Sequence, residues 1–347
     1  MTILPSSIPS PDYSWQVFYF GTWLHDIGLT WVTIPIPIHA YALCIMTGIV
    51  AAALLAGYRL KLRGADAGVV LDIALWNVPL GIIGGRMFHV ITHPDDYFGA
   101  GKDLMKVFYI WEGGLAIFGA LMLGAVGTFI GCRLSGVRFT SFVDAVAPGL
   151  LLAQAFGRLG NYFNHELYGL PTNLPWGLEI ESTNAAFPAG LPEGTLFHPT
   201  FLYEIIWNLI GVAVLLYIER RWHLVKRTIP FLDVVVRAPK AGAYRLQWGK
   251  MLGAYLIWYG VGRSFFESIR IDPSEIFFGI RTNVWASFGA ILVGVIIIIV
   301  QSRRHPGMEP SPYLPGREWS AEEPLRIEDS YTDAEFDNAT TTAGKKS

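Results

Sequence analysis

Residues 145–169 read AVAPGLLLAQAFGRLGNYFNHELYG, an apolar run that ends in an arginine, two asparagines, a histidine and a glutamate. A mostly apolar segment of about 20 residues is long enough to cross a bilayer as a helix. Charged side chains are costly in the hydrocarbon region, and those that occur there commonly mark functional sites. The stretch therefore predicts a membrane helix over residues 142–160 with a polar cluster at its end.

The composition of the whole chain is typical of a membrane protein. Of its 347 residues, 52% are hydrophobic and 16% are charged, which is far from the average of soluble domains. The two cysteines, Cys44 and Cys132, lie in apolar segments and are interpreted as small core residues, since two cysteines make no disulfide framework. Residues 1–58 contain no lysine or arginine. A cleavable signal peptide begins with a basic region, so the N-terminal segment is expected to be retained.

Six further segments have the length and composition of membrane helices. They are residues 37–57, 70–91, 113–132, 200–218, 250–267 and 283–301. The predicted fold class is therefore all-α, a polytopic membrane protein with seven transmembrane helices. Residues 1–36 are expected to form an external segment with an interfacial helix at 15–29. Residues 37–301 form the predicted helical domain, and residues 302–347 have the composition of a disordered cytoplasmic tail.

Lysine and arginine residues are unevenly distributed among the connections between these helices. Connections rich in them belong on the cytoplasmic side of a membrane protein. Residues 58–69, 133–138, 219–249 and 303–304 are rich in lysine and arginine, whereas residues 1–36, 92–112, 161–199 and 268–282 are poor in them. The sequence thus predicts an external N-terminus and a cytoplasmic C-terminus.

Three arginines are predicted at one depth, near the external ends of their helices: Arg86, Arg158 and Arg263. Each alone could be an interfacial anchor whose guanidinium reaches the lipid phosphates. Anchoring arginines are expected mainly on the cytoplasmic side, so three on the external side indicate an anion-binding site. Guanidinium groups match the oxygens of a phosphate. A phospholipid headgroup is therefore the expected ligand.

Further polar residues are predicted at the same level. They are Glu166, Glu204, Glu267, His39, Tyr41 and His198. The glutamates can neutralise part of the arginine charge, while each histidine or tyrosine alone is equally typical of a structural or interfacial residue. Asn161 and Asn164 can cap the helix end, and Gly169 can permit a tight turn.

The pattern G-R-x-G-N-x-x-N-x-E-x-x-G at 157–169 is more specific than a helix end requires, and it resembles the signature of the prolipoprotein diacylglyceryl transferase family. Other stretches of the chain match the same family. They are His39-x-Tyr41, GGR at 84–86, WEGG at 111–114, HPTFLYE at 198–204 and YGVGRSFFE at 259–267. The resemblance extends over approximately residues 35–300.

The resemblance implies a reaction, two substrates and a location. Members of this family transfer the diacylglyceryl group of phosphatidylglycerol to the lipobox cysteine thiol of a preprolipoprotein signal peptide, forming a thioether and releasing glycerol phosphate. No metal or organic cofactor is implied, and the sequence shows no metal-ligand cluster and no nucleic-acid-binding module. The implied location is the bacterial plasma membrane, with the protein multi-pass and its active site toward the outer leaflet.

The resemblance also implies roles for residues in the matching stretches. The implied catalytic residues are Arg158, Arg263, His39, Tyr41, Asn161 and Glu166. The implied substrate-binding residues are Arg158, Arg86, Arg263, Tyr259, Asn164, Gly169, His198, Glu204 and Glu267. Arg158 and Arg263 are expected to stabilise charge on the leaving phosphate. His39 and Tyr41 are expected to orient the headgroup or the thiol, and Asn161, Asn164 and Glu166 to organise the loop around Arg158.

The sequence departs from the family pattern at the expected general base. Many members have HGG in the third span, whereas this chain has Phe118-Gly119-Ala120, and phenylalanine accepts no proton. His39, His198, Glu166 and Glu204 all stay open as bases, as does a thiol pKa lowered by the arginines alone. Two rival classes also stay open, a phospholipid transporter and a lipid-binding membrane scaffold.

The histidine alternatives predict a change in the pH profile of transfer. A histidine base works in its neutral form, so activity falls as pH drops through its pKa, ordinarily about 6.5. His39→Ala or His198→Ala should remove this acidic limb, measured as transfer from phosphatidylglycerol to a lipobox peptide across pH. Unchanged profiles in both variants would eliminate both histidines as the base.

Overall fold

A computed structural model describes residues 7–19, 21, 25, 27–28, 37–99, 101–225, 236–244, 246–272, 274–305 and 309–317. The described residues contain seven long helices. These are α2 (Ala40–Leu62), α3 (Val69–Thr92), α5 (Ile117–Leu134), α6 (Phe139–Phe163), α7 (Thr200–Glu219), α8 (Lys250–Ile269) and α9 (Thr282–Arg304). Each coincides with one predicted segment to within a few residues, so the mostly helical fold is confirmed.

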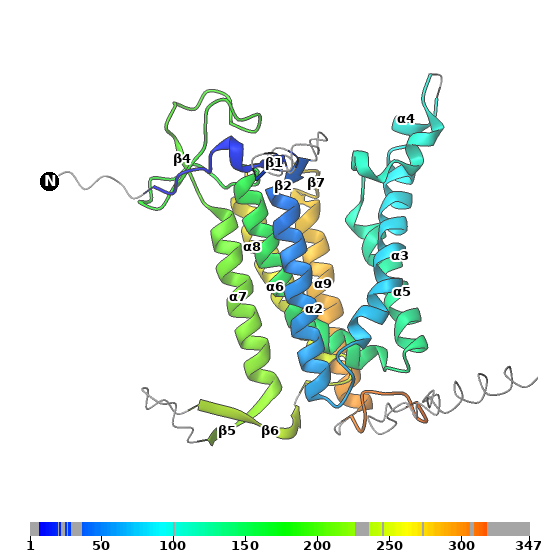
Figure 1. Ribbon diagram of the computed structural model, residues 1–347. Coiled ribbons are helices and arrows are strands. Elements are labelled where there is room, and N and C mark those ends of the chain that lie inside the picture. The colour runs from blue at the N-terminus through cyan, green and yellow to red at the C-terminus, as the bar shows by residue number, and fades with distance from the viewer. Residues whose placement is uncertain are drawn as a thin grey trace, which may run out of the picture.

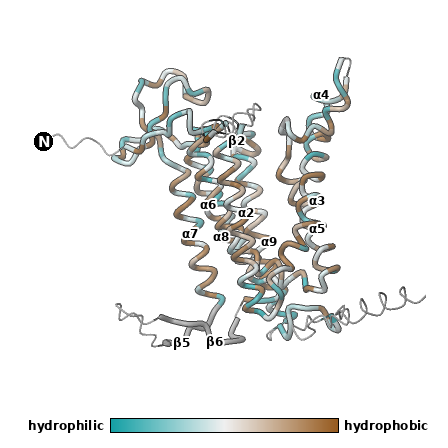
Figure 2. The backbone as a smooth tube through the Cα atoms, in the orientation of Figure 1, coloured by the Kyte–Doolittle hydropathy of each residue, from teal (hydrophilic) through white to brown (hydrophobic). Residues whose placement is uncertain are grey.

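Six of these helices are long and apolar enough to cross a membrane: α2, α3, α5, α6, α7 and α9. Helix α8 is 20 residues long but is not among them. Its sequence carries Lys250, Arg263 and Glu267, which lower its mean hydropathy. Figure 2 shows hydrophobic residues along the helices and hydrophilic residues gathered in the connections. The chain is therefore a polytopic membrane protein.

Short elements close the two ends of the helices. The short helices are η1 (Tyr13–Trp15), α4 (Pro94–Tyr97), η2 (Leu104–Phe108) and η3 (Ile110–Glu112). The longer strands are β1 (Val17–Tyr19), β2 (Pro37–His39), β5 (Arg220–Val225) and β6 (Val236–Tyr244). The two-residue strands are β3 (Leu178–Glu179), β4 (Leu196–Phe197), β7 (Ile276–Phe277) and β8 (Ile280–Arg281). The strands pair antiparallel as β1–β2, β3–β4, β5–β6 and β7–β8. We call the end with α4, β1–β4 and β7–β8 the cap end, and the end with β5–β6 the base end (Figure 1).

The interfacial helix predicted over 15–29 is wrong for residues 17–19, whereas residues 21 and 25 are helical. Residues 17–19 form strand β1, which pairs with β2 so that Val17 lies opposite His39. An extended segment here can exchange backbone hydrogen bonds with the strand that enters α2, which a helix lying on the membrane could not do. Residues 20, 22–24, 26 and 29–36 lie outside the described residues.

Helix α6 packs against α2, α7 and α8 and so occupies the middle of the bundle. Small residues allow the closest of these contacts, as is common between membrane helices. A Cβ added to Gly149 would lie 3.0 Å from the carbonyl oxygen of Ala52, and one added to Gly48 would lie 3.0 Å from that of Ala153. The backbones of α2 and α6 therefore touch along their length.

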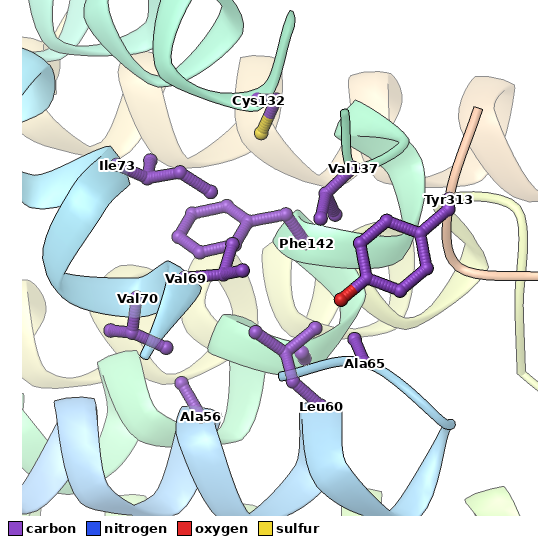
Figure 3. Packing of buried hydrophobic residues seen from close by; sticks show 11 residues of the cluster. Ala56, Leu60, Ala65, Val69, Val70, Ile73, Cys132, Val137, Phe142 and Tyr313 are labelled. Atoms are coloured by element: carbon purple, nitrogen blue, oxygen red, sulfur yellow. The ribbon is translucent and has the colours of Figure 1, made fainter. Parts of the chain in front are cut away.

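Helices α3 and α5 form a separate pair. They pack tightly on each other, where an added Cβ at Gly119 would lie 2.1 Å from the carbonyl oxygen of Gly84. Figure 1 shows the pair leaning away from the other helices toward the cap end. At the base end a buried apolar cluster joins the pair to α2 and α6, with Ile73 and Cys132 on one side and Leu60 and Phe142 on the other (Figure 3).

The predicted disordered tail begins too early. Helix α9 continues through Arg304, and residues 309–317 pack along the base end. Tyr313 is buried in the apolar cluster of Figure 3, and its hydroxyl accepts a hydrogen bond of 2.9 Å from the backbone N–H of Asp66. Leu314 donates from its N–H to the carbonyl of Gly136 at 2.7 Å. Burial of the Tyr313 ring and these hydrogen bonds offset the conformational entropy lost when residues 309–317 become ordered. Residues 318–347 lie outside the described residues.

Buried charges tie the base ends of four helices together. Arg59 of α2, 1% exposed, donates from Nη2 to the Glu219 carboxylate of α7 at 2.6 Å. The same carboxylate receives Arg63 at 2.6 Å. The fully buried Asp144 of α6 accepts from the backbone N–H groups of Gly249 at 2.8 Å and Met251 at 2.9 Å, and so caps α8. Partners from different helices thus compensate the desolvation of these charges.

Glu219→Ala is expected to destabilise the bundle by about 3–5 kcal/mol, because it leaves Arg59 buried without its carboxylate. Thermal unfolding of the purified protein in detergent measures this loss. Asp72→Ala removes an exposed carboxylate from α3 and serves as the control, with a change of about 0.5 kcal/mol or less. Equal unfolding temperatures for both variants would contradict the structural role of Glu219.

Candidate active site

The end of α6 meets the start of α7 through an ion pair. Arg158 stands in the last turns of α6, and its Nε lies 2.7 Å from Oε2 of Glu204 in the first turns of α7. Arg158 also donates from Nη1 to the Asn161 side chain at 3.1 Å. Glu204 is buried, whereas the Arg158 side chain is 22% exposed. The carboxylate thus holds the guanidinium in place and leaves part of it accessible.

Arg263 stands in the last turns of α8 and, like Arg158 on α6, pairs with a glutamate. Its Nη2 lies 2.9 Å from Oε2 of Glu267, one helical turn away. The other oxygen of Glu267 receives Arg281 at 3.4 Å and the Asn283 amide at 2.9 Å, which link α8 to the start of α9. Glu267 is fully buried. This carboxylate therefore fixes Arg263 and ties α8 to the start of α9.

Arg158 and Arg263 line the same cavity, which we call the arginine cavity and which has a volume of about 130 Å³. Glu204 and Tyr259 also line it. The Nη1 atom of Arg263 is buried and has no hydrogen-bond partner among the described residues. A buried cationic donor without an acceptor is costly, so this atom points to a missing anionic or hydrogen-bonding ligand.

The two asparagines of the 157–169 stretch share one carboxylate. Asn161 donates to Oε1 of Glu166 at 2.8 Å, and Asn164 donates to the same oxygen at 3.2 Å. Asn161 therefore accepts from Arg158 and donates to Glu166 at the same time. The chain of contacts orients the Arg158 guanidinium and shapes the loop that follows α6.

Gly169 joins this loop to the neighbouring helices. Its N–H donates to the carbonyl of His198 at 2.9 Å, and the next N–H, of Leu170, donates to the carbonyl of Ile269 at 2.8 Å. An added Cβ would lie 2.8 Å from the His198 Cβ and 2.9 Å from the Ile269 carbonyl oxygen. Only glycine fits this approach, through which the α6–α7 loop contacts the ends of both α7 and α8.

The predicted histidines and Tyr41 lie at the starts of α2 and α7. Tyr41, at the start of α2, packs its ring on Gly160 of α6, where an added Cβ would lie 2.6 Å from the Tyr41 Cδ2. His39 is exposed at the junction of β2 and α2. His198 lies before α7 with its Nδ1 3.2 Å from the Tyr203 hydroxyl. Both histidines are thus at the cap end, but neither lines the arginine cavity.

Arg86 does not join the other two arginines. Its Nε donates to the carbonyl of Val107 at 2.8 Å and its Nη1 to that of Gly113 at 2.6 Å, while Nη2 contacts the carbonyl of Lys106. Its guanidinium also lies 5.0 Å from the ring centre of Tyr97. Backbone carbonyls, not a phosphate, satisfy this cation, because the loop between α4 and α5 folds back over α3.

A model of the prolipoprotein diacylglyceryl transferase family matches residues 29–300 of this sequence. The chain belongs to this family. The family and the transferase class predicted from the sequence motifs are thereby confirmed.

Curated relatives support the assignment over most of the chain. A protein of Leifsonia xyli subsp. xyli named phosphatidylglycerol–prolipoprotein diacylglyceryl transferase is 54% identical over 337 residues, covering 95% of this chain and 91% of its own. A second transferase of that name, from Streptomyces coelicolor, is 44% identical over 275 residues, 79% of each chain. One from Bifidobacterium adolescentis is 43% identical over 274 residues, 77% of this chain and 76% of its own.

The position of the missing family histidine in this transferase lies outside the cavity. Phe118 stands on α5, half exposed, with its ring 6.3 Å from that of Phe88 on α3. It does not line the arginine cavity. The departure at this position therefore affects a residue outside the cavity that Arg158 and Arg263 line.

Sequence reasoning missed two groups that organise the candidate site. Arg281, beside Glu267, is one; it is one of two arginines, with Arg270, in the lysine-free segment 268–282, and that was the available signal. The other is His165, buried with a positive φ of 52°, whose Nδ1 lies 3.0 Å from the Glu181 carboxylate. Its ring packs 4.7 Å from that of Tyr13. His165 thus holds the N-terminal segment against the α6–α7 loop.

Gly169→Ala is expected to destabilise the transferase by about 1–3 kcal/mol, since the new methyl group must displace packed atoms. It should also slow transfer, because the loop that orients Arg158 moves. Gly289→Ala is the matched control, since an added Cβ at Gly289 meets nothing within 4 Å. Thermal unfolding and transfer to a lipobox peptide measure both effects. Wild-type behaviour of Gly169→Ala would show that the loop tolerates the displacement.

Proposed function

We propose that this chain transfers the diacylglyceryl group of phosphatidylglycerol to the lipobox cysteine thiol of a preprolipoprotein. The observation that carries the proposal is the convergence of Arg158 and Arg263 on one cavity, with the Arg263 Nη1 free of protein acceptors among the described residues. The relatives named above carry both substrates in their names.

The two guanidinium groups suit a lipid phosphodiester. Arg158 enters from α6 and Arg263 from α8, and each is already bound on one side by a glutamate. The carboxylates compensate part of the buried positive charge, while Nη1 of Arg263 keeps a donor without an acceptor among the described residues. Fixed donors of this kind need no reorganisation as negative charge grows on the leaving group.

The proposed reaction is a displacement at carbon. The thiolate sulfur of the lipobox cysteine attacks the glyceryl carbon that bears the phosphate ester, and a C–S bond forms. The C–O bond to the phosphate breaks, and glycerol phosphate leaves with the bonding electrons. The thiol proton passes to a base. Charge thereby shifts from the sulfur to the phosphate oxygens beside Arg158 and Arg263, which stabilises the transition state more than the ground state.

Among the base candidates, a carboxylate that lines the cavity and has few other contacts is best suited to accept the thiol proton. Glu166 already receives two amides, from Asn161 and Asn164. Glu204 lines the cavity and bonds Arg158 through one oxygen. We infer that Glu204 accepts the thiol proton, with its charge balanced by Arg158 before the transfer. His39 and His198 would then act by positioning.

The proposed orientation places the cap end outside the cell. The base end carries the basic hairpin β5–β6 and the ends of α2, α5 and α9, whose last turns contain Arg59, Arg133 and Arg303. Lysine and arginine concentrate on the cytoplasmic side. The arginine cavity then opens toward the outer leaflet, with seven membrane crossings that include α8 and an external N-terminus.

A transporter or scaffold would bind the same headgroup without breaking a bond, but the family assignment favours the transferase. Product formation decides between these functions. Thioether formation by protein purified in detergent, where no second compartment exists, supports the transferase. Binding of phosphatidylglycerol without product would favour the other two classes.

Arg158→Ala and Arg263→Ala are each expected to lower kcat for transfer by roughly 100-fold or more, the scale seen when a transition-state donor is removed. Arg133→Ala deletes an exposed arginine at the base end and should retain near-normal turnover. The assay measures diacylglyceryl transfer from phosphatidylglycerol to a lipobox peptide. Near-normal turnover in either cavity variant, with folding intact, would remove that arginine from the proposed mechanism.

A further inference from the structure

The arginine cavity has a second layer of polar residues one helical turn deeper in the bundle. Each helix that supplies a charged residue to the cavity also supplies a neutral polar one, four residues away and on the same face. The three pairs are Arg158 with Gln154 on α6, Glu204 with Asn208 on α7, and Arg263 with Tyr259 on α8. All six side chains line the same cavity.

The direction of the three helices makes the second layer the deeper one. Helices α6 and α8 run toward the cap end, so Gln154 and Tyr259 precede their arginines. Helix α7 runs toward the base end, so Asn208 follows Glu204. One turn of helix is about 5.4 Å. A charged layer therefore lies above a layer that consists of two amides and a phenol.

Asn208 is the strongest sign that this deeper layer binds a ligand. Its residue exposure is only 6%, and its amide makes no hydrogen bond to another described residue, but the amide atoms are not fully buried and remain accessible in the cavity. An accessible amide without a protein partner offers both a donor and an acceptor to a ligand. Since Asn208 lines the cavity, a ligand in the cavity is the available partner.

The Gln154 side chain on α6 is oriented by a hydrogen bond. Its Nε2 donates to the Tyr255 hydroxyl at 2.9 Å, which fixes the amide with its oxygen side left for another partner. Tyr255 in turn stacks near Tyr259, with ring centres 6.1 Å apart. The amide of α6 and the phenol of α8 are thus oriented by the protein before any ligand binds.

Apolar walls restrict what can occupy this layer. Trp207 and Phe266 line the cavity beside Asn208. The indole N–H of Trp207 reaches the carbonyl of Trp258 at 3.4 Å, and that of Trp258 reaches the carbonyl of Trp207 at 3.2 Å, with the rings stacked 4.4 Å apart. This reciprocal contact holds α7 and α8 at a fixed separation. The cavity of about 130 Å³ therefore admits only a small group.

We propose that Gln154, Asn208 and Tyr259 select the lipid donor by hydrogen bonding the two hydroxyl groups of its glycerol headgroup, while Arg158 and Arg263 hold the phosphate above them. The inference rests on the proposed function and specifies the headgroup of that donor. Amides and a phenol can both donate to and accept from a hydroxyl. The layer itself contains no carboxylate, and the cavity-lining carboxylate above it, Glu204, is already paired with Arg158, so the ammonium of an amino headgroup would meet two arginines and only one paired anion.

The test compares two anionic donor lipids that differ in their headgroup hydroxyls. Phosphatidylglycerol carries the diol, and phosphatidylethanol carries the same phosphodiester charge without a hydroxyl. Each is supplied in mixed micelles with a lipobox peptide and the full-length purified protein, and kcat/KM is measured for both. Sites built to hydrogen-bond a hydroxyl strongly reject analogues that lack it, so the wild type should prefer phosphatidylglycerol by roughly 100-fold or more.

Asn208→Ala and Gln154→Ala should each lower kcat/KM for phosphatidylglycerol by about 10-fold, the effect of losing one net hydrogen bond. Turnover of phosphatidylethanol should stay unchanged, so the selectivity falls by the same factor. Ser264→Ala, whose hydroxyl bonds the Gly260 carbonyl of its own helix, is the control and should keep wild-type selectivity. The two variants lie on different helices, so either one suffices if the other fails to fold.

The outcomes separate this inference from the proposed function. A wild type that transfers nothing from phosphatidylglycerol would overturn the proposed function itself. A wild type that uses both lipids equally well would overturn the inference alone, since the deeper layer would then hold only water. Equal losses for both lipids in Asn208→Ala and Gln154→Ala would do the same, because they would assign these residues a purely structural role.

Discussion

Helix α6 is held at both ends by buried charged groups that connect it to other helices, and the geometry of the site depends on these contacts. At the base end the Asp144 carboxylate of α6 caps α8, and Arg59 of α2, which pairs with Glu219 of α7, also contacts the carbonyls of Asp144 and Ala145 of α6. At the cap end Arg158 pairs with Glu204. A charge in an apolar bundle is stable only with a partner, so each contact fixes one helix against another. The relative positions of α6, α7 and α8 follow from both sets.

The polar residues after α6 extend this constraint into the loop. Glu166 collects the amides of Asn161 and Asn164, and Gly169 brings the chain against the ends of α7 and α8. A short stretch of sequence therefore both supplies the cavity-lining Arg158 and builds the loop that holds its surroundings. This double role explains why so many polar residues stand at a helix end.

Much of the fold could be predicted, since apolar length and composition determine where membrane helices form. All seven predicted segments are helices in the structure. The prediction was wrong for β1 and for residues 309–317, because short polar segments acquire their structure from contacts that local sequence does not reveal. Tyr313 is an example: its burial depends on a pocket made by Leu60, Phe142 and Val137 of other segments.

For the candidate site, too, some features follow from the sequence and others only from the tertiary structure. The sequence by itself determined the family, the charged residues and which of them share a helix face, because the helical repeat fixes the neighbours at four-residue spacing. Glu267 beside Arg263 follows from that repeat alone. Only the tertiary structure decided which helices meet: Arg158 joins Arg263 in one cavity, whereas Arg86, on the separate α3–α5 pair, is bound by backbone carbonyls. Depth in the membrane can be derived from hydropathy, but lateral position depends on the packing of side chains between helices, which no single helix encodes.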